Sequence, residues 1–150
     1  MPPKLPIETL TELARSRTEE AARQLAALRT ASMSASGKLE LLLQYRRDYG
    51  EQLQAMMREG LGCAQLRNFQ DFLRALDAGI EEQRSAASRT ETRLDHGRKD
   101  WQQQHRRLNA FETLADRMHQ QAVIAQGRRE QRASDEQAAR MVLCRSASAQ

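Results

Sequence analysis

Aromatic residues, glycine, proline and cysteine are all scarce in this chain. Of its 150 residues, 4% are aromatic, and there are 7 Gly, 3 Pro and 2 Cys. Few glycines and prolines leave few places for turns, so the secondary-structure elements must be long. The mean hydropathy of -0.78 is also low. The composition therefore excludes the compact apolar core that a globular domain of this length normally builds.

The sequence also lacks the usual signals of secretion, membrane insertion and disulfide bonding. Cys63 and Cys144 have no CxxC partner and no histidine at metal-ligand spacing, which is typical of reduced thiols in a cytoplasmic protein. The opening MPPKLPIETL has no apolar run long enough for a signal peptide. Nowhere do about eighteen apolar residues follow one another. We expect a soluble, cytoplasmic protein.

No catalytic or cofactor-binding motif is present. His96, His105 and His119 have no nucleophile or paired carboxylate in register, and neither GxxxxGK nor GxGxxG occurs. The net charge of +4 comes from 24 basic and 20 acidic residues mixed along the chain, which is weak evidence for nucleic-acid binding. We expect a protein that is not an enzyme and that binds no cofactor, no metal and no nucleic acid.

Heptad spacing of apolar residues dominates the sequence and indicates two helices packed along a seam. The first stripe is Ala21, Leu25, Leu28, Ser32, Ala35, Leu39, Leu42, Arg46, Tyr49, Leu53 and Met56, extended upstream by Ile7, Leu10 and Ala14. The second is Leu66, Phe69, Leu73, Leu76, Ile80, Gln83, Ala87, Thr90, Leu94, Gly97, Trp101, Gln104, Leu108, Phe111, Ala115, Met118, Ala122 and Ala125, none of them charged. We predict helices over about 6–58, with Pro6 in the first turn, and about 64–135, ending between Arg129 and Arg140.

The segment EGLGC, Glu59 to Cys63, is the predicted turn, because glycine stops a helix and so short a connection makes the helices antiparallel. The fold class is all-α: one helical-hairpin domain over 1–150 with a flexible, Ser- and Ala-rich tail at 141–150. Folding at the turn pairs residues whose numbers add up to about 122. Ile7 then faces Ala115, and the second stripe continues beyond it without a partner.

Four ring-bearing residues fall near this turn. Tyr49 and Phe69 lie on the seams, where we predict that they pack into the facing helix. Tyr45 and Phe72 lie one step off the seams, so they either widen the apolar flank or form a patch that a partner protein contacts.

Two other seam residues are unusual. The long side chain of Arg46 is predicted to lie along the seam while its guanidinium reaches solvent or Asp77. Gly97 either permits a close approach of the helices or marks a flexible point.

Several stretches resemble the FliJ family, the small coiled-coil component of the flagellar type III export apparatus. They are ETLTELA and EEAARQL near the start, LLLQYRRDYGEQL, NFQDFLRALDAGIEEQ, Trp101, and RRLNAFETLADR near the end. The resemblance covers nearly the whole chain. It implies an antiparallel coiled coil similar to the rotor shaft of rotary ATPases. The family's export-gate surface falls here on Leu42, Tyr45, Tyr49, Phe72 and Leu76, with Lys38, Gly79 and Gln83 where family members carry Gln, Ala and His.

The partners implied are the hexameric export ATPase, the cytoplasmic part of the membrane export gate and substrate-specific export chaperones. The protein is then expected to be monomeric alone and associated with the inner face of the cell membrane at the flagellar base. We predict that the open end of the hairpin enters the ATPase ring, with Leu114, Met118, Ala122 and Ala125 facing it. Two alternatives stay open from the sequence: a coiled-coil tether or adaptor, and a helical protein that binds nucleic acid.

Overall fold

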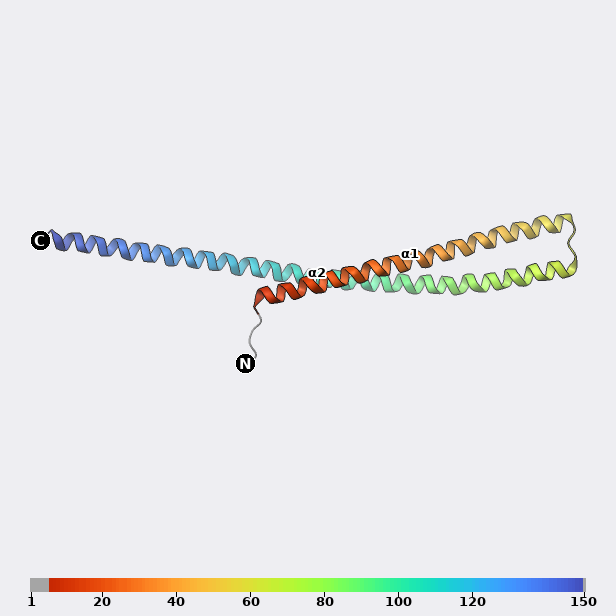
Figure 1. Ribbon diagram of the computed structural model, residues 1–150, viewed down its shortest axis with the longest axis horizontal. Helices are drawn as coiled ribbons and strands as arrows, with labels where there is room; N and C mark the ends of the chain where they lie inside the picture. Colours follow the sequence, from red (N-terminus) through yellow and green to blue (C-terminus); the bar gives the residue numbers. More distant parts are fainter. Residues whose placement is uncertain (1–5, 150) are drawn as a thin grey trace, which may run out of the picture. The chain divides into compact units, whose positions relative to one another are not determined.

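The computed structural model describes residues 6–149 and contains two helices, α1 (Ile7–Glu59) and α2 (Cys63–Ser148). No strand occurs in that range. The two helices pack against each other in antiparallel directions, as Figure 1 shows for the part of the chain next to the turn. The prediction of an all-α fold built from two long helices is therefore confirmed. Residues 1–5 and 150 of the predicted domain lie outside the described residues.

Pro6 precedes α1, whereas the sequence predicted it inside the first turn. The Leu10 N–H donates a hydrogen bond of 3.2 Å to the Pro6 carbonyl, which makes Pro6 the residue that caps the helix. Glu8 follows in the first turn, where a carboxylate interacts favourably with the helix dipole. The rigid ring of Pro6 thus lies where its missing N–H costs nothing.

The turn consists of residues 60–62, and both of its glycines have a structural role. Gly60 ends α1 in the left-handed region, with φ of 95°, which residues carrying a Cβ adopt only at a cost. The Gly62 carbonyl accepts a hydrogen bond of 3.0 Å from the Leu66 N–H and so begins α2. A connection this short leaves α2 no direction except back along α1.

The end of α2 differs from the prediction. The helix continues to Ser148, so the predicted end between Arg129 and Arg140 is wrong. Residues 128–148 contain neither glycine nor proline and are rich in Ala, Arg, Gln and Glu, all strong helix formers. Intrinsic propensity alone therefore carries the helix beyond the part that packs against another helix.

Contacts divide the chain into two units. One is Arg17–Gln104, a helical hairpin that includes the turn; the other combines residues up to Ser16 with the chain from His105 onward. The buried apolar residues of the hairpin are Ala21, Leu25, Ala35, Leu73 and Ile80. Those of the other unit are Ala14 and Leu108, with Thr11 buried beside them. All lie on the predicted stripes except Thr11, and no described large side chain is completely buried, so the core of each unit is a narrow seam.

Polar residues on the hairpin seam find partners across it. The Gln83 side chain donates from Nε2 to the Ala35 carbonyl at 3.0 Å, and Thr18 donates from Oγ1 to the Gln104 carbonyl at 3.1 Å. These pairings match the register predicted from the turn. A buried donor that finds a carbonyl avoids the cost of an unpaired polar group, so the seam accepts Gln and Thr where a coiled coil would normally carry Leu.

Gly97 lies where Leu28 of α1 presses against α2. A methyl group at residue 97 would clash with the Leu28 side chain, whereas one at Gly37 would meet nothing within 4 Å. The structure therefore favours the close-approach interpretation of Gly97.

Replacing Gly37 by Ala is expected to raise the free energy of unfolding by about 1 kcal/mol through helix propensity alone. Gly97→Ala should bring a smaller gain, because the Cδ1 end of the Leu28 side chain must shift to make room. Urea denaturation followed by circular dichroism measures both. An equal stabilisation by the two substitutions would contradict the close packing at Gly97.

Candidate functional site

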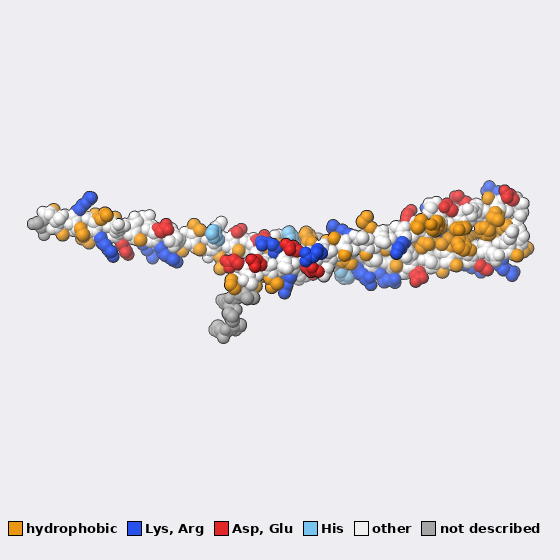
Figure 2. All heavy atoms as spheres, in the orientation of Figure 1, with side chains coloured by type: hydrophobic (Ala, Val, Ile, Leu, Met, Phe, Trp, Pro, Cys, Tyr) orange, Lys and Arg blue, Asp and Glu red, His pale blue; other side chains and the backbone are white. Residues whose placement is uncertain are grey.

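Aromatic side chains gather on the hairpin near the turn. The rings of Tyr49 and Phe72 lie with their centroids 4.7 Å apart at an interplanar angle of 58°. Together with Phe69 and Asn68 they line a shallow groove of about 250 Å³. Figure 2 shows hydrophobic side chains collected on this part of the hairpin. We call Tyr45, Tyr49, Phe69 and Phe72 the aromatic cluster.

The cluster is exposed to an extent that a packed seam would not allow. Tyr45 is 46% exposed and Phe72 45%, as their off-seam positions predicted. Tyr49 is 37% exposed, yet its ring contacts Phe72 of the facing helix, so the prediction that it packs against that helix is confirmed. A seam between only two helices has solvent on both sides, which leaves part of the Tyr49 ring exposed. Three rings are therefore available to a partner.

The other residues that the resemblance assigns to this surface lie nearby on the two helices. Leu42 and Leu76 are half-buried on the seam, so each offers only part of its side chain. Lys38 is exposed, and a side chain added at Gly79 would meet nothing within 4 Å. Gln83 instead points inward to the Ala35 carbonyl. Its amide already has a partner and is a poor candidate for contact with another protein.

Arg46 forms a polar border beside the rings. Its Nε lies 2.7 Å from Oδ1 of Asp77, and both side chains are more than a third exposed. This confirms the prediction that the Arg46 guanidinium reaches Asp77. An ion pair so exposed adds little stability. Its contribution is to orient the guanidinium next to the aromatic cluster.

A second apolar surface lies on the part of α2 from His105 onward, which belongs to the other unit. Leu114 and Met118 are 46% and 48% exposed, Ala122 is exposed and Ala125 is half-buried. Beyond Leu108, no described residue of this unit is buried. We call these four residues the bare α2 face, since no other described segment covers them.

Sequence reasoning overlooked further exposed apolar residues on the same helix. They are Val123, Ile124, Met141, Val142 and Leu143, each more than half exposed. The run of Met141 to Leu143 was visible in the sequence. It was passed over because the segment was predicted to be a flexible tail rather than a helix.

Nothing in residues 6–149 suggests a metal centre or a membrane span. No three His, Cys, Asp or Glu side chains there lie close enough together to hold a metal ion. Across the same residues, neither helix contains a stretch apolar enough to cross a membrane. Cys63 and Cys144 are exposed free thiols.

The sequence matches known proteins over most of its length. The family model described as flagellar FliJ protein matches residues 3–146. The flagellar FliJ protein of Salmonella typhi is 31% identical over 137 residues, covering 91% of this chain and 93% of the relative. That of Escherichia coli (strain K12) is 29% identical with the same coverage. The chain belongs to the FliJ family of flagellar proteins.

Proposed function

We propose that this protein is a non-enzymatic component of the flagellar type III export apparatus. In this role it promotes assembly and activity of the export ATPase ring as a central stalk and links the ring to the cytoplasmic part of the membrane export gate. It also escorts export chaperones. Such work places it in the cytoplasm, at the inner face of the membrane at the flagellar base. The proposal rests on the family match over 3–146 combined with a helical hairpin.

The observation that carries the proposal is that each unit exposes its own apolar surface. The aromatic cluster belongs to the Arg17–Gln104 unit, and the bare α2 face belongs to the other unit, which contains α2 from His105 onward. Exposed contiguous apolar residues mark interaction sites, and aromatic side chains supply much of the binding energy at such sites. Two separate surfaces support a protein that contacts two partners.

We assign the aromatic cluster, with Leu42 and Leu76, to the export gate and the bare α2 face to the ATPase ring. The gate assignment follows the resemblance in Leu42, Tyr45, Tyr49, Phe72 and Leu76 and is supported by the exposure of the three rings. The ring assignment is supported by the lack of a covering segment over Met118 and Ala122 among the described residues. Small side chains such as Ala122 and Ala125 also let another helix approach closely.

Mixing the purified protein with its cognate export ATPase tests the proposal. We expect faster ATP hydrolysis and more hexamer in the presence of the protein, measured by phosphate release and by sedimentation. The Tyr45→Ala variant should stimulate ATP hydrolysis by the export ATPase as strongly as the unchanged protein does, because Tyr45 is assigned to the other partner. If the unchanged protein altered neither hydrolysis nor hexamer formation, the stalk role would be wrong.

A coiled-coil tether that pairs with a second copy of itself is the alternative. It is favoured by the bare α2 face, which a second copy could cover. Sedimentation equilibrium distinguishes the two, since a tether of this kind gains mass as concentration rises. A monomer mass that is independent of concentration would exclude it.

A further inference from the structure

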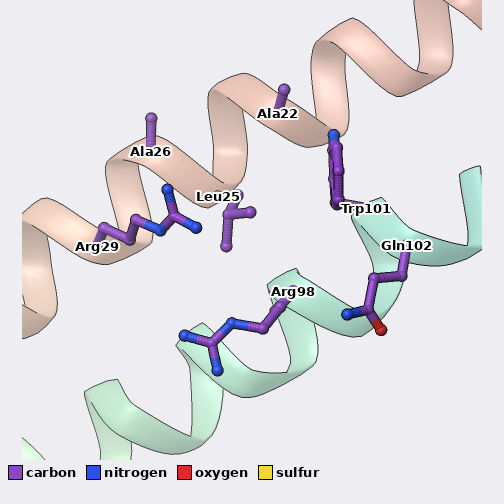
Figure 3. Close-up of a pocket in the computed structure, with 7 residues that line it drawn as sticks. All are labelled: Ala22, Leu25, Ala26, Arg29, Arg98, Trp101 and Gln102. Carbon is purple, nitrogen blue, oxygen red and sulfur yellow. The ribbon is translucent and has the colours of Figure 1, made fainter. Parts of the chain in front are cut away.

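An open groove in the middle of the hairpin is used by neither surface of the proposed function. It has a volume of about 480 Å³. It is lined by Ala22, Leu25, Ala26 and Arg29 of α1 and by Arg98, Trp101 and Gln102 of α2. Figure 3 shows the guanidinium groups of Arg29 and Arg98 on one side of Leu25 and the Trp101 ring on the other. All seven residues belong to the Arg17–Gln104 unit.

The floor of this groove and part of its wall are apolar, and the apolar part of the wall is low. Leu25 is only 6% exposed and forms the floor, while Trp101 is half-buried and presents part of its indole. Ala22 and Ala26 are exposed and too short to fill the space above Leu25. A single apolar side chain of about the size of leucine, offered from outside, would be buried between Leu25 and the indole.

The two arginines at the groove can bind an anion from another molecule, because neither is held in a short ion pair. Arg29 makes no ion pair with any residue in the described part of the chain, and Arg98 lies 3.8 Å from an exposed Asp95 carboxylate. Arg23, nearly two turns earlier on α1, behaves differently: its hydrogen bond of 2.7 Å to Glu20, with the charge attraction, holds the pKa of Glu20 below its usual value. Guanidinium groups without a close carboxylate partner are ready to bind carboxylates from another molecule.

The surrounding surface is the most basic part of the chain. No acidic residue occurs in residues 21–39. Together with residues 83–101, which the register brings opposite, this section holds eight basic residues, Arg23, Arg29, Lys38, Arg84, Arg89, Arg93, Arg98 and Lys99, against three acidic ones, Glu91, Asp95 and Asp100. Its net charge of +5 exceeds the +4 of the whole chain. A ligand for the groove is therefore expected to be acidic.

We propose that this groove binds an acidic peptide segment of a partner protein. One leucine-sized side chain of the segment covers Leu25 beside Trp101, and flanking Asp or Glu carboxylates pair with Arg29 and Arg98. Nucleic acid fits less well, because Glu91, Asp95 and Asp100 interrupt the basic surface and Trp101 is the only Phe, Tyr or Trp in residues 21–39 and 83–101 on which a base could stack.

The single tryptophan makes the groove directly measurable. Since Trp101 is the only Trp of the chain, its fluorescence reports the groove alone when the added ligand contains none. The probe is a capped synthetic helix of Glu and Ala with one central Leu. We expect saturable binding with a blue shift of the Trp101 emission, and about tenfold weaker binding when the central Leu is replaced by Ala. A peptide with Gln in place of Glu should bind more weakly still.

Charge variants separate the groove from a general charge effect. Arg29→Gln and Arg98→Gln should each weaken the probe about fivefold. Arg93→Gln removes the same charge from the same section without lining the groove, so it should leave binding nearly unchanged. All three arginines are exposed and glutamine is a good helix former, so circular dichroism should show the fold intact.

Three results would overturn the proposal. One is an unchanged Trp101 emission on addition of the Leu-containing acidic helix. Another is an equal loss of binding in Arg93→Gln, which would indicate attraction to the whole basic surface. The third is displacement of the probe by an oligothymidine at equal charge concentration, which would assign the surface to nucleic acid. The Arg29→Gln variant should stimulate the ATPase normally. Loss of peptide binding therefore tests the groove, whereas loss of ATPase stimulation tests the stalk role.

Discussion

Truncation after Ala115 is expected to reduce the hydrolysis rate of the export ATPase to that of the ATPase alone, while the hairpin stays folded. The deletion removes Met118, Ala122 and Ala125, the greater part of the bare α2 face. Every buried residue in the described part of the chain, up to and including Leu108, precedes residue 116. Folding should therefore survive, and the loss would report the missing contact. Phosphate release measured across a titration of the truncated protein gives the result.

Two further variants control for the size of this deletion. Truncation after Gly127 keeps the bare α2 face and removes the exposed Met141, Val142 and Leu143, so activation should be retained. In the full-length chain, replacing Met118 and Ala122 by Asp should abolish activation, because charged side chains exclude these positions from an apolar contact. Full activation by the chain that ends at Ala115 would show that the ring binds elsewhere.

Removing two rings of the aromatic cluster is expected to weaken binding to the export gate by about a hundredfold or more, since exposed aromatic anchors dominate interfaces of this kind. The variant is the double substitution of Tyr45 and Phe72 by Ala. Both side chains are nearly half exposed in the free protein, so the substitutions create no cavity in the seam. Calorimetric titration of the purified cytoplasmic part of the gate protein measures the affinity.

Met33→Ala is the matched control for the loss of apolar surface. Met33 is 76% exposed on α1 and lies outside the aromatic cluster, so its substitution should leave gate binding unchanged. The hydrolysis rate of the ATPase should also be unaffected by the double substitution, because the bare α2 face is intact. Equal weakening by Met33→Ala, or normal gate binding by the double variant, would remove the aromatic cluster as the gate surface.

Heptad spacing was enough to predict the seam, and the short connection at Glu59 to Cys63 predicted the antiparallel pairing of the helices. The period of apolar residues is a local property, and a stripe such as Leu73 to Ile80 must face a partner wherever that partner comes from. Gly60 and Gly62 marked the turn for an equally local reason, since only glycine accepts the φ of 95° at residue 60 without strain. Arg46 and Asp77 followed from the register, because a long side chain on a seam must reach an acid or water.

The end of α2 was missed although its cause is also local. A tail of Ser, Ala and Arg at a chain end is typical of disorder, but it is equally free of helix breakers, and composition does not decide between the two. Helix through Ser148 follows once the preceding turns of α2 are in place, because each added residue extends an existing helix without a new nucleus.

The environment of individual side chains depended on both helices together. Tyr49 occupies a seam position in the sequence, and its ring packs against Phe72 of α2 while remaining 37% exposed, because two helices alone do not enclose it. Gln83 turns inward because the Ala35 carbonyl lies opposite, which no pattern within α2 reveals. The groove of Leu25, Arg29, Arg98 and Trp101 exists only between the helices. Periodicity determines which face of a helix is covered, whereas the contacts made there depend on side chains that are far apart in the chain.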